Sequence, residues 1–356
     1  MDAPRPGVAV SAAPPTPARR ALRAAAWAAL GLSFPVWFSA FAAPLLPLGA
    51  GQKAAFAAAC IAAGEALFWG AGLVLGAEVI ARFRGRRVAT GASFAGRRVA
   101  VIGATGGLGA AVARAVVREG GAVVLLARDA SRLRPLADEL GAPSAVTDLT
   151  PSSLRAAAAA CGAVDHVVCA TGVDVRRALA DHSDGDVASQ LDVALAGPVH
   201  VARAFLGSLR EGGTIALFGG FADGTLALPY YSVDVAARAG LAGFCAAVNQ
   251  ELAVEGRAER LCYVGPAPAD TEAERPFAPL WRKMGTAMAP PARVADFVLA
   301  ALLARRTVAV MGRSTRLLAR LRALAPAAVD GLVARRVGPA LREAFARPEE
   351  RGASPP

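Results

Sequence analysis

The chain has 356 residues, a formal net charge of +11 and 55% hydrophobic residues. This length suffices for one large domain plus an appendage, and the apolar content suffices for a core. The basic excess is almost all arginine and is compatible with nucleic acid or an anionic membrane surface. Because no nucleic-acid-binding motif accompanies the basic runs, we expect no nucleic-acid partner and favour membrane lipid. The five cysteines lack CxxC spacing, which predicts reduced, buried thiols.

Residues 1–23 are basic and rich in Pro and Ala, with little to bury, so we expect this segment to be disordered. Residues 24–43 then carry no charge over about 20 positions, enough to cross a hydrocarbon core of ~30 Å as a helix. A second long apolar stretch, residues 54–80, is interrupted by Glu65. Together the two stretches predict a transmembrane helical hairpin over residues 24–81.

Arginines flank both stretches on their outer sides, whereas the turn between them carries only Lys53. The positive-inside rule therefore predicts that both flanks and the following domain lie on the cytoplasmic side of a bacterial-type inner (plasma) membrane. The alternative for the first stretch is a signal peptide, since residues 40–42 (AFA) offer a small-x-small cleavage site. In that case the second stretch would stop transfer and leave the same domain in the cytosol.

The hairpin also resembles a small two-helix bacterial membrane module, the transporter suffix domain, over residues 32–84 and especially in GEALFWGAGLVLGAEVIARFR. This resemblance implies no chemistry. An ionised Glu65 inside a membrane would cost about 2.5 to 3.5 kcal/mol on insertion scales, so we expect its carboxyl to be protonated or paired. A partner helix from a second copy or from another membrane protein would satisfy it.

Residues 97–109 (RRVAVIGATGGLG) read as a strand, a tight turn and the start of a helix. Gly103 permits the turn, Gly106 or Gly107 lets the backbone approach a phosphate, and Gly109 lets the helix lie close to the sheet. A pyrophosphate would sit at the helix N-terminus, where unpaired N–H groups favour negative charge. An ordinary Gly-rich strand-to-helix turn is the alternative, but a second strand pattern at residues 122–126 completes a unit of the required size.

From there on, strand patterns alternate with alanine-rich helical stretches, which predicts an α/β fold with a Rossmann-like, doubly wound parallel sheet. The expected strands centre near Val99, Val123, Ala145, Val164, Thr214, Leu261 and Val308.

The order and spacing of GATGGLG, LLARDASRL, VTDLT, VDHVVCATG, AGPVHVARAF, GGTIALFGG, AARAGLAGF and VGPAPADT resemble the short-chain dehydrogenase/reductase family. The likeness covers residues 96–312 and leaves residues 313–356 as a basic amphipathic tail. The tail could lie on the anionic membrane surface or pack on another subunit.

The family implies a nicotinamide cofactor, and the end of the second strand bears on which one. Members that bind NAD place an acidic residue there, whereas this chain has Arg128, followed by Arg132 and Arg134. A guanidinium suits the 2′-phosphate of NADP, so we expect NADP(H) rather than NAD(H); ordinary surface arginines are the alternative. The positions that the resemblance assigns to cofactor binding are Gly103, Thr105, Gly106, Gly107, Leu108, Gly109, Arg128, Asp148, Ala170, Gly172 and Arg238. Asp129 would alternatively cap a helix.

The family's catalytic residues are replaced. Aligning AARAGLAGF with the family pattern puts Asp234 at the tyrosine and Arg238 at the lysine, and the serine and asparagine positions fall at Gly220 and Ala194. No catalytic residue is therefore present in family form. Tyr231 could substitute as an acid, or could simply line the cleft. Two functions stay open, an oxidoreductase with an unrecognised acid and a non-catalytic module that senses nucleotide or scaffolds a partner.

Asp234 itself is expected to be a poor acid, because Arg238 one turn later should lower its pKa further and leave it ionised in a salt bridge. The three histidines have no carboxylate or cysteine partner at ligand spacing, so we expect no metal. Residues 268–290, with Trp281, could form a lid over the substrate or a surface excursion.

Overall fold

The computed structural model describes residues 17–85, 94–220 and 226–345. Of the segment 1–23 that we expect to be disordered, residues 1–16 lie outside the described residues, whereas residues 17–23 belong to the first helix, so the expectation was wrong for them. The chain divides into two compact units, Met1–Ala89 and Thr90–Pro356, each of which is described by itself. This boundary falls between the predicted hairpin and the predicted nucleotide-binding domain.

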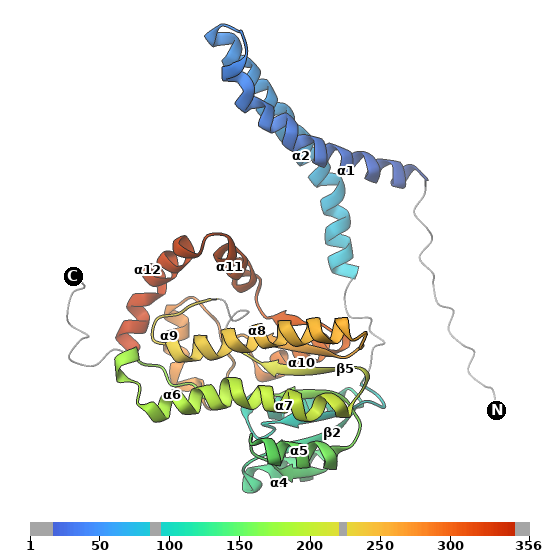
Figure 1. Cartoon of the computed structure of the whole chain (residues 1–356), viewed down its shortest axis with the longest axis vertical. Coiled ribbons are helices and arrows are strands. Elements are labelled where there is room, and N and C mark those ends of the chain that lie inside the picture. The colour runs from blue at the N-terminus through green and yellow to red at the C-terminus, as the bar shows by residue number, and fades with distance from the viewer. Residues whose placement is uncertain (1–16, 86–93, 221–225, 346–356) are drawn as a thin grey trace, which may run out of the picture. The chain divides into compact units, whose positions relative to one another are not determined.

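The first unit is a helical hairpin of α1 (Pro17–Phe38), the 3-10 turn η1 (Ser39–Leu45) and α2 (Ala50–Gly85) (Figure 1). Two segments, Ala24–Leu45 and Ala50–Gly72, are long and apolar enough to cross a membrane. Only 11% of each is buried, unlike the core helix of a soluble protein. At Gly64 a Cβ would lie 2.9 Å from Cβ of Trp37, so glycine permits the two helices to approach closely.

Glu65 accepts a hydrogen bond of 2.7 Å from the indole Nε1 of Trp69, one turn later on the same helix. A single copy of the chain thus offers this carboxyl a partner. Association with a further helix stays a prediction.

The second unit is built on a seven-stranded, wholly parallel sheet with the order β3-β2-β1-β4-β5-β6-β7. The strands are β1 (Arg98–Ile102), β2 (Ala122–Ala127), β3 (Ser144–Val146), β4 (Val164–Cys169), β5 (Leu209–Phe218), β6 (Arg260–Gly265) and β7 (Val308–Val310). Each predicted strand is present, and the Rossmann-like fold is confirmed.

Helices cover both faces of the sheet. The longer ones are α3 (Gly107–Arg118), α4 (Ala130–Leu140), α5 (Pro151–Cys161), α6 (Asp184–Leu191), α7 (Gly197–Phe205), α8 (Ser232–Val254) and α10 (Pro291–Leu303). Because side chains alternate along β1, Val99 and Val101 join the core under α3, α4 and α10, while Ala100 and Ile102 join the core under α5, α7 and α8. Such burial on both faces explains the continuous apolar runs in the strands.

The strand order reverses at β1 and β4, and in open α/β sheets ligands bind at the carboxyl ends of strands beside such a switch point. Two segments close over this edge. One holds η5 (Arg275–Phe277) and α9 (Ala278–Lys283), and the other holds α11 (Arg313–Leu324) and α12 (Pro326–Phe345). Leu341 of α12 is fully buried against Tyr231 and Leu280, so the C-terminal helices pack on their own unit.

Candidate functional site

The turn between β1 and α3 has the form predicted from its glycines. Gly103 has a φ of +77°, and a Cβ there would lie 2.9 Å from the carbonyl oxygen of Ala170. A Cβ at Gly109 would overlap the carbonyl oxygen of Gly103, so only glycine lets α3 lie this close to β1. Gly106 caps α3 with no side-chain acceptor, which leaves the first N–H groups of the helix open to an anion. These features fit a dinucleotide's pyrophosphate.

A cavity of about 520 Å³ begins at this turn. Gly106, Gly107 and Leu108 line one end, and Ala170 and Gly172, which follow β4, line its wall. The structure thus brings the predicted glycine turn and the predicted CATG segment to the same cavity. At Gly107 a Cβ would lie 2.5 Å from Cγ2 of Thr271, so this turn also supports the segment that covers the cavity.

The remaining predicted cofactor residues lie at the carboxyl ends of β2 and β3. Arg128 is exposed there, and Arg132 donates a hydrogen bond of 3.2 Å to the carbonyl oxygen of Thr105 in the glycine turn. Asp129 caps α4, accepting from the backbone N–H groups of Ser131 and Arg132, as its alternative role predicted. The Asp148 carboxylate accepts from the backbone N–H and hydroxyl of Thr150, which holds its pKa below the ordinary value.

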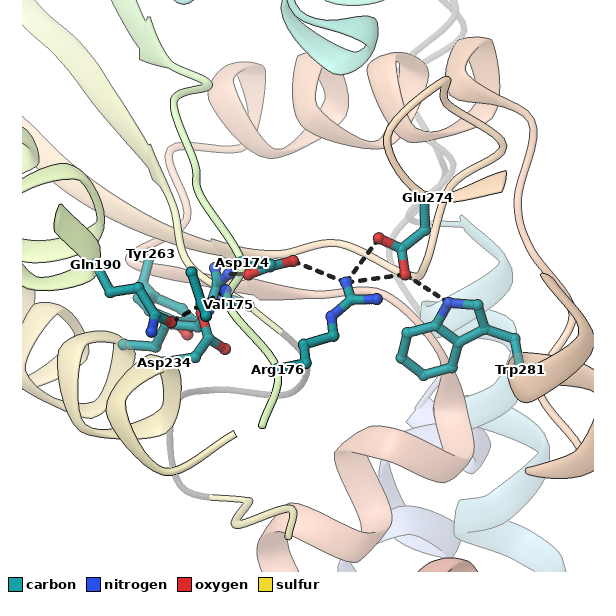
Figure 2. A network of polar contacts seen from close by, with 10 residues as sticks. Asp174, Val175, Arg176, Gln190, Asp234, Tyr263, Glu274 and Trp281 are labelled. Atoms are coloured by element: carbon teal, nitrogen blue, oxygen red, sulfur yellow. Dashed lines mark hydrogen bonds and ion pairs between the residues drawn. The ribbon is translucent and has the colours of Figure 1, made fainter. Parts of the chain in front are cut away.

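At the far end of the cavity two arginines and three carboxylates form one network (Figure 2). Arg238 donates from Nε to Asp234 at 2.7 Å and from Nη2 to Asp174 at 2.8 Å. The second oxygen of Asp174 accepts from Nη2 of Arg176 at 2.8 Å. The same Nη2 contacts both oxygens of Glu274, at 2.7 and 3.0 Å. The network therefore links α8, the segment after β4 and the segment before η5.

Burial changes how these carboxyls titrate. It raises the pKa of Asp234 from 3.8 to about 6; the charge of Arg238 opposes this rise, and the nearby charge of Asp174 adds to it. The expectation of a lowered pKa was wrong, because it counted Arg238 and left out burial and Asp174. For Asp174, burial alone would raise the pKa, but Arg238 and then Arg176 outweigh it and hold the pKa below its ordinary value. Of this pair, Asp234 is therefore the carboxyl that takes up a proton first as the pH falls.

Gly220, which the sequence alignment predicts at the position of the family's serine, is packed against Arg238. A Cβ at Gly220 would overlap Cδ and Nε of Arg238 and lie 2.8 Å from its Cζ. The backbone N–H of Gly220 donates to the hydroxyl of Tyr263 at 3.2 Å. Ala194, predicted at the asparagine position, is buried in a π-helical turn, η3 (Asp192–Ala196).

Comparison with known proteins decides the family. The sequence model of the short chain dehydrogenase family matches residues 97–279, just over half of the chain. The chain therefore belongs to the short-chain dehydrogenase family. A comparison with curated protein sequences found no match.

Solved structures of short-chain dehydrogenases share this fold. A Burkholderia cenocepacia short chain dehydrogenase in complex with NADP is 21% identical, with a TM-score of 0.59, over 68% of this chain and 98% of that one. An NADPH-bound short chain oxidoreductase from Pseudomonas aeruginosa, described as containing an atypical catalytic center, is 23% identical. Its TM-score is 0.56, over 61% of this chain and 97% of that one. At these identities the likeness shows the fold alone.

In this short-chain dehydrogenase, residues 268–290 cover the cavity. Hydrogen bonds of Asp270 and Ala289 close the base of the segment, while Glu274, Phe277 and Trp281 line the cavity. Trp281 is buried and donates from its indole Nε1 to Glu274 at 2.5 Å. The segment therefore lies over the cavity, as expected for a lid and not for a surface excursion.

Tyr231 also lines the cavity, and its ring packs edge-on against Phe345 of α12. Burial raises its pKa and the charge of Arg176 only partly offsets this, so the phenol keeps its proton.

Sequence reasoning missed Asp174, Arg176 and Glu274. No motif holds them, and Arg176 meets Glu274 across 98 positions of sequence. One signal was available in the sequence, the two charged residues of VDVR that directly follow CATG. Residues that follow a parallel strand lie at the edge of the sheet where ligands bind.

Proposed function

We propose that this protein is a membrane-anchored, NADP(H)-dependent oxidoreductase in which Asp234 supplies the proton that a tyrosine supplies elsewhere in the family. The observation that carries the proposal is the single cavity that runs from the glycine turn at Gly106 to Asp234. A cofactor at the turn and a proton donor at the far end would face the same cavity.

The cofactor end supports a dinucleotide. The uncapped N-terminus of α3 offers N–H groups to a pyrophosphate. Arg128 and Arg132 stand beside the ribose position that the family assigns to the end of β2, which favours the 2′-phosphate of NADP. The NADP and NADPH bound to the relatives named above agree with this choice.

Reduction of a carbonyl at the Asp234 end of the cavity needs a proton donor. When bound, NADPH supplies a hydride to a carbonyl carbon. The Asp234 carboxyl gives its proton to the carbonyl oxygen as the O–H bond forms, and the resulting carboxylate takes a proton back from solvent. Since the pKa of Asp234 is raised to about 6, enough acid form is present near pH 6 for this step and little at pH 8. Gly220 offers no hydroxyl to the oxygen, so we expect slow turnover.

A second function is favoured by Arg238. Its guanidinium pairs with Asp174 and Asp234. Arg238 therefore contributes to this polar network and is not free to bind the cofactor. A non-catalytic module that binds nucleotide and senses its state or scaffolds a partner would need no proton donor.

NADPH consumption by the full chain in detergent, measured over a panel of ketones and aldehydes from pH 5 to 8, separates these functions. We expect a low rate that increases as the pH falls toward 6 and that Asp234→Asn abolishes. Asp330→Asn is the matched control, because Asp330 pairs with Arg322 outside the cavity. An unchanged rate in Asp234→Asn would remove the proposed proton donor, and NADPH binding without consumption at any pH would support the non-catalytic module.

The membrane anchor is part of the proposal. The two apolar segments of α1 and α2 support two spans, with the nucleotide-binding unit on the cytoplasmic face of a bacterial-type plasma membrane. Exposed aromatic side chains on the hairpin, Trp27, Phe41 and Trp69 among them, suit contact with lipid. A homo-oligomer or a membrane-protein partner would form through the same hairpin.

A further inference from the structure

The lid end of the cavity holds hydrogen-bond donors that no described residue satisfies. Arg176 is 5% exposed at its side chain, yet its Nε and Nη1 have no acceptor. The hydroxyl of Tyr231, a residue that is 6% exposed, likewise has no partner. Buried polar groups are hydrogen-bonded in the great majority of native sites, because an unsatisfied buried donor destabilises the fold. Both residues line the cavity, so a ligand bound there is the candidate acceptor for these donors.

The walls around these donors are aromatic. The Arg176 guanidinium lies 4.2 Å from the ring centroid of Phe277, 5.3 Å from that of Tyr231 and 6.0 Å from that of Trp281. Phe277, Tyr231 and Trp281 all line the cavity. An apolar, planar body fits such walls, while the donors fit an oxygen attached to it.

The net charge of the surrounding network determines whether the ligand's oxygen is charged or neutral. Arg176 and Arg238 already face three carboxyls, those of Asp174, Asp234 and Glu274. With the proton on Asp234 this network is neutral, and without it the network is negative. A carboxylate or phosphate ligand would add another negative charge to a buried site that has no spare positive one. The acceptor that fits is a neutral oxygen, and the carbonyl oxygen that the proposed reaction requires is one.

We propose that Arg176 and the hydroxyl of Tyr231 bind the carbonyl oxygen of a neutral, apolar ketone, held between the rings of the lid. This assignment rests on the proposed function, for which it names the substrate class. It gives Tyr231 a role as a hydrogen-bond donor that keeps its proton, distinct from the proton transfer assigned to Asp234.

Three probes of similar shape test the assignment, namely acetophenone, ethylbenzene and benzoate. Binding is followed by the fluorescence of Trp281 in a full-length variant with Trp27, Trp37 and Trp69 changed to Phe. We expect acetophenone to bind more tightly than ethylbenzene and benzoate. Each probe also partitions into detergent micelles. Because this partition is the same for every variant in one detergent, it cancels in the ratio of a probe's affinities for two variants.

Tyr231→Phe is the decisive variant, since it removes an unpartnered hydroxyl and keeps the ring. We expect acetophenone affinity to fall about 2- to 10-fold, with ethylbenzene affinity and thermal stability not reduced. Tyr230→Phe, which changes the adjacent tyrosine outside the cavity, should leave all three affinities as they are. Arg176→Lys keeps the charge that faces Asp174 and Glu274 and should lower acetophenone affinity further than ethylbenzene affinity.

Equal binding of acetophenone and ethylbenzene, or an acetophenone preference that survives Tyr231→Phe, would overturn the inference. Tightest binding of benzoate would overturn the neutral ligand. NADPH is titrated into the same variants. If NADPH binds while the acetophenone preference is absent, the inference fails and the proposed function stands. If the preference depends on Tyr231 while NADPH does not bind, the proposed function fails and the ligand site stands.

Discussion

Gly220→Ser tests whether Arg238 fills the space that the family gives to a serine side chain. A Cβ at this position would lie 2.8 Å from Cζ of Arg238 and would overlap Cδ and Nε. Overpacking of this kind costs about 1 to 3 kcal/mol. Swinging Arg238 away would instead break its pairs with Asp234 and Asp174, and breaking a buried pair costs about 3 to 5 kcal/mol. We therefore expect Gly220→Ser to destabilise the unit by about 1 to 3 kcal/mol.

Unfolding is measured on the full chain in detergent with a thiol-reactive fluorogenic dye in a Cys60→Ala background. The four remaining cysteines are all buried in the nucleotide-binding unit, so the dye reports that unit and not the hairpin. Gly243→Ser on α8 is the control, since a Cβ there meets no atom within 4 Å.

A double-mutant cycle with Arg238→Lys completes the test. The shorter and narrower lysine should accept the serine, so the cost of Gly220→Ser should shrink by about 1 kcal/mol or more in that background. Equal stability of Gly220→Ser and the wild type, or a cycle with no coupling, would show that Arg238 does not occupy this space.

Three further predictions concern charge, cofactor and topology. Because burial raises the pKa of Asp234 to about 6 from 3.8, its folded state binds a proton that the unfolded chain releases, so stability should rise as the pH falls from about 7 through 6 toward 4. Asp234→Asn should flatten this rise in urea unfolding, and an unchanged slope would contradict the assignment. Isothermal titration should show NADPH binding more tightly than NADH, and Arg128→Glu should reverse the order; equal wild-type affinities would remove the claim. A cysteine at Gly51 should react with an impermeant maleimide in intact cells of the Cys60→Ala strain, whereas recovery of the whole chain in the soluble fraction would refute the anchor.

The sheet and the glycine turn could be predicted because their signals are local. Apolar runs of strand length, each followed by a helical stretch, specify parallel strands, and Gly103 and Gly109 are required by contacts within one β-α unit. The predicted cofactor turn and the CATG segment meet because both follow strands at the switch point. No long-range information was needed for either.

The polar network could not be predicted, because its members are brought together only by tertiary structure. Asp174 and Arg238 are 64 positions apart, and Arg176 and Glu274 are 98 apart. The pKa of Asp234 was predicted in the wrong direction for the same reason. The spacing of four residues showed the attraction of Arg238, while the burial of Asp234 and the charge of Asp174 depend on the complete fold.

Three of the positions that the alignment predicts to be replaced, Gly220, Asp234 and Arg238, form one packing unit. Arginine at position 238 needs the room that Gly220 leaves, and its charge needs two carboxylates. Asp234, predicted at the family's tyrosine position, supplies one carboxyl group, and Asp174 supplies the other. Gly220→Ser alone creates a clash, and Asp234→Tyr alone removes the acceptor of the hydrogen bond from Arg238 Nε. A chain that carries Gly220→Ser, Asp234→Tyr and Arg238→Lys together should therefore be more stable than the sum of the three single changes predicts, and Ala194→Asn belongs as a fourth change only if the buried π-turn accepts it.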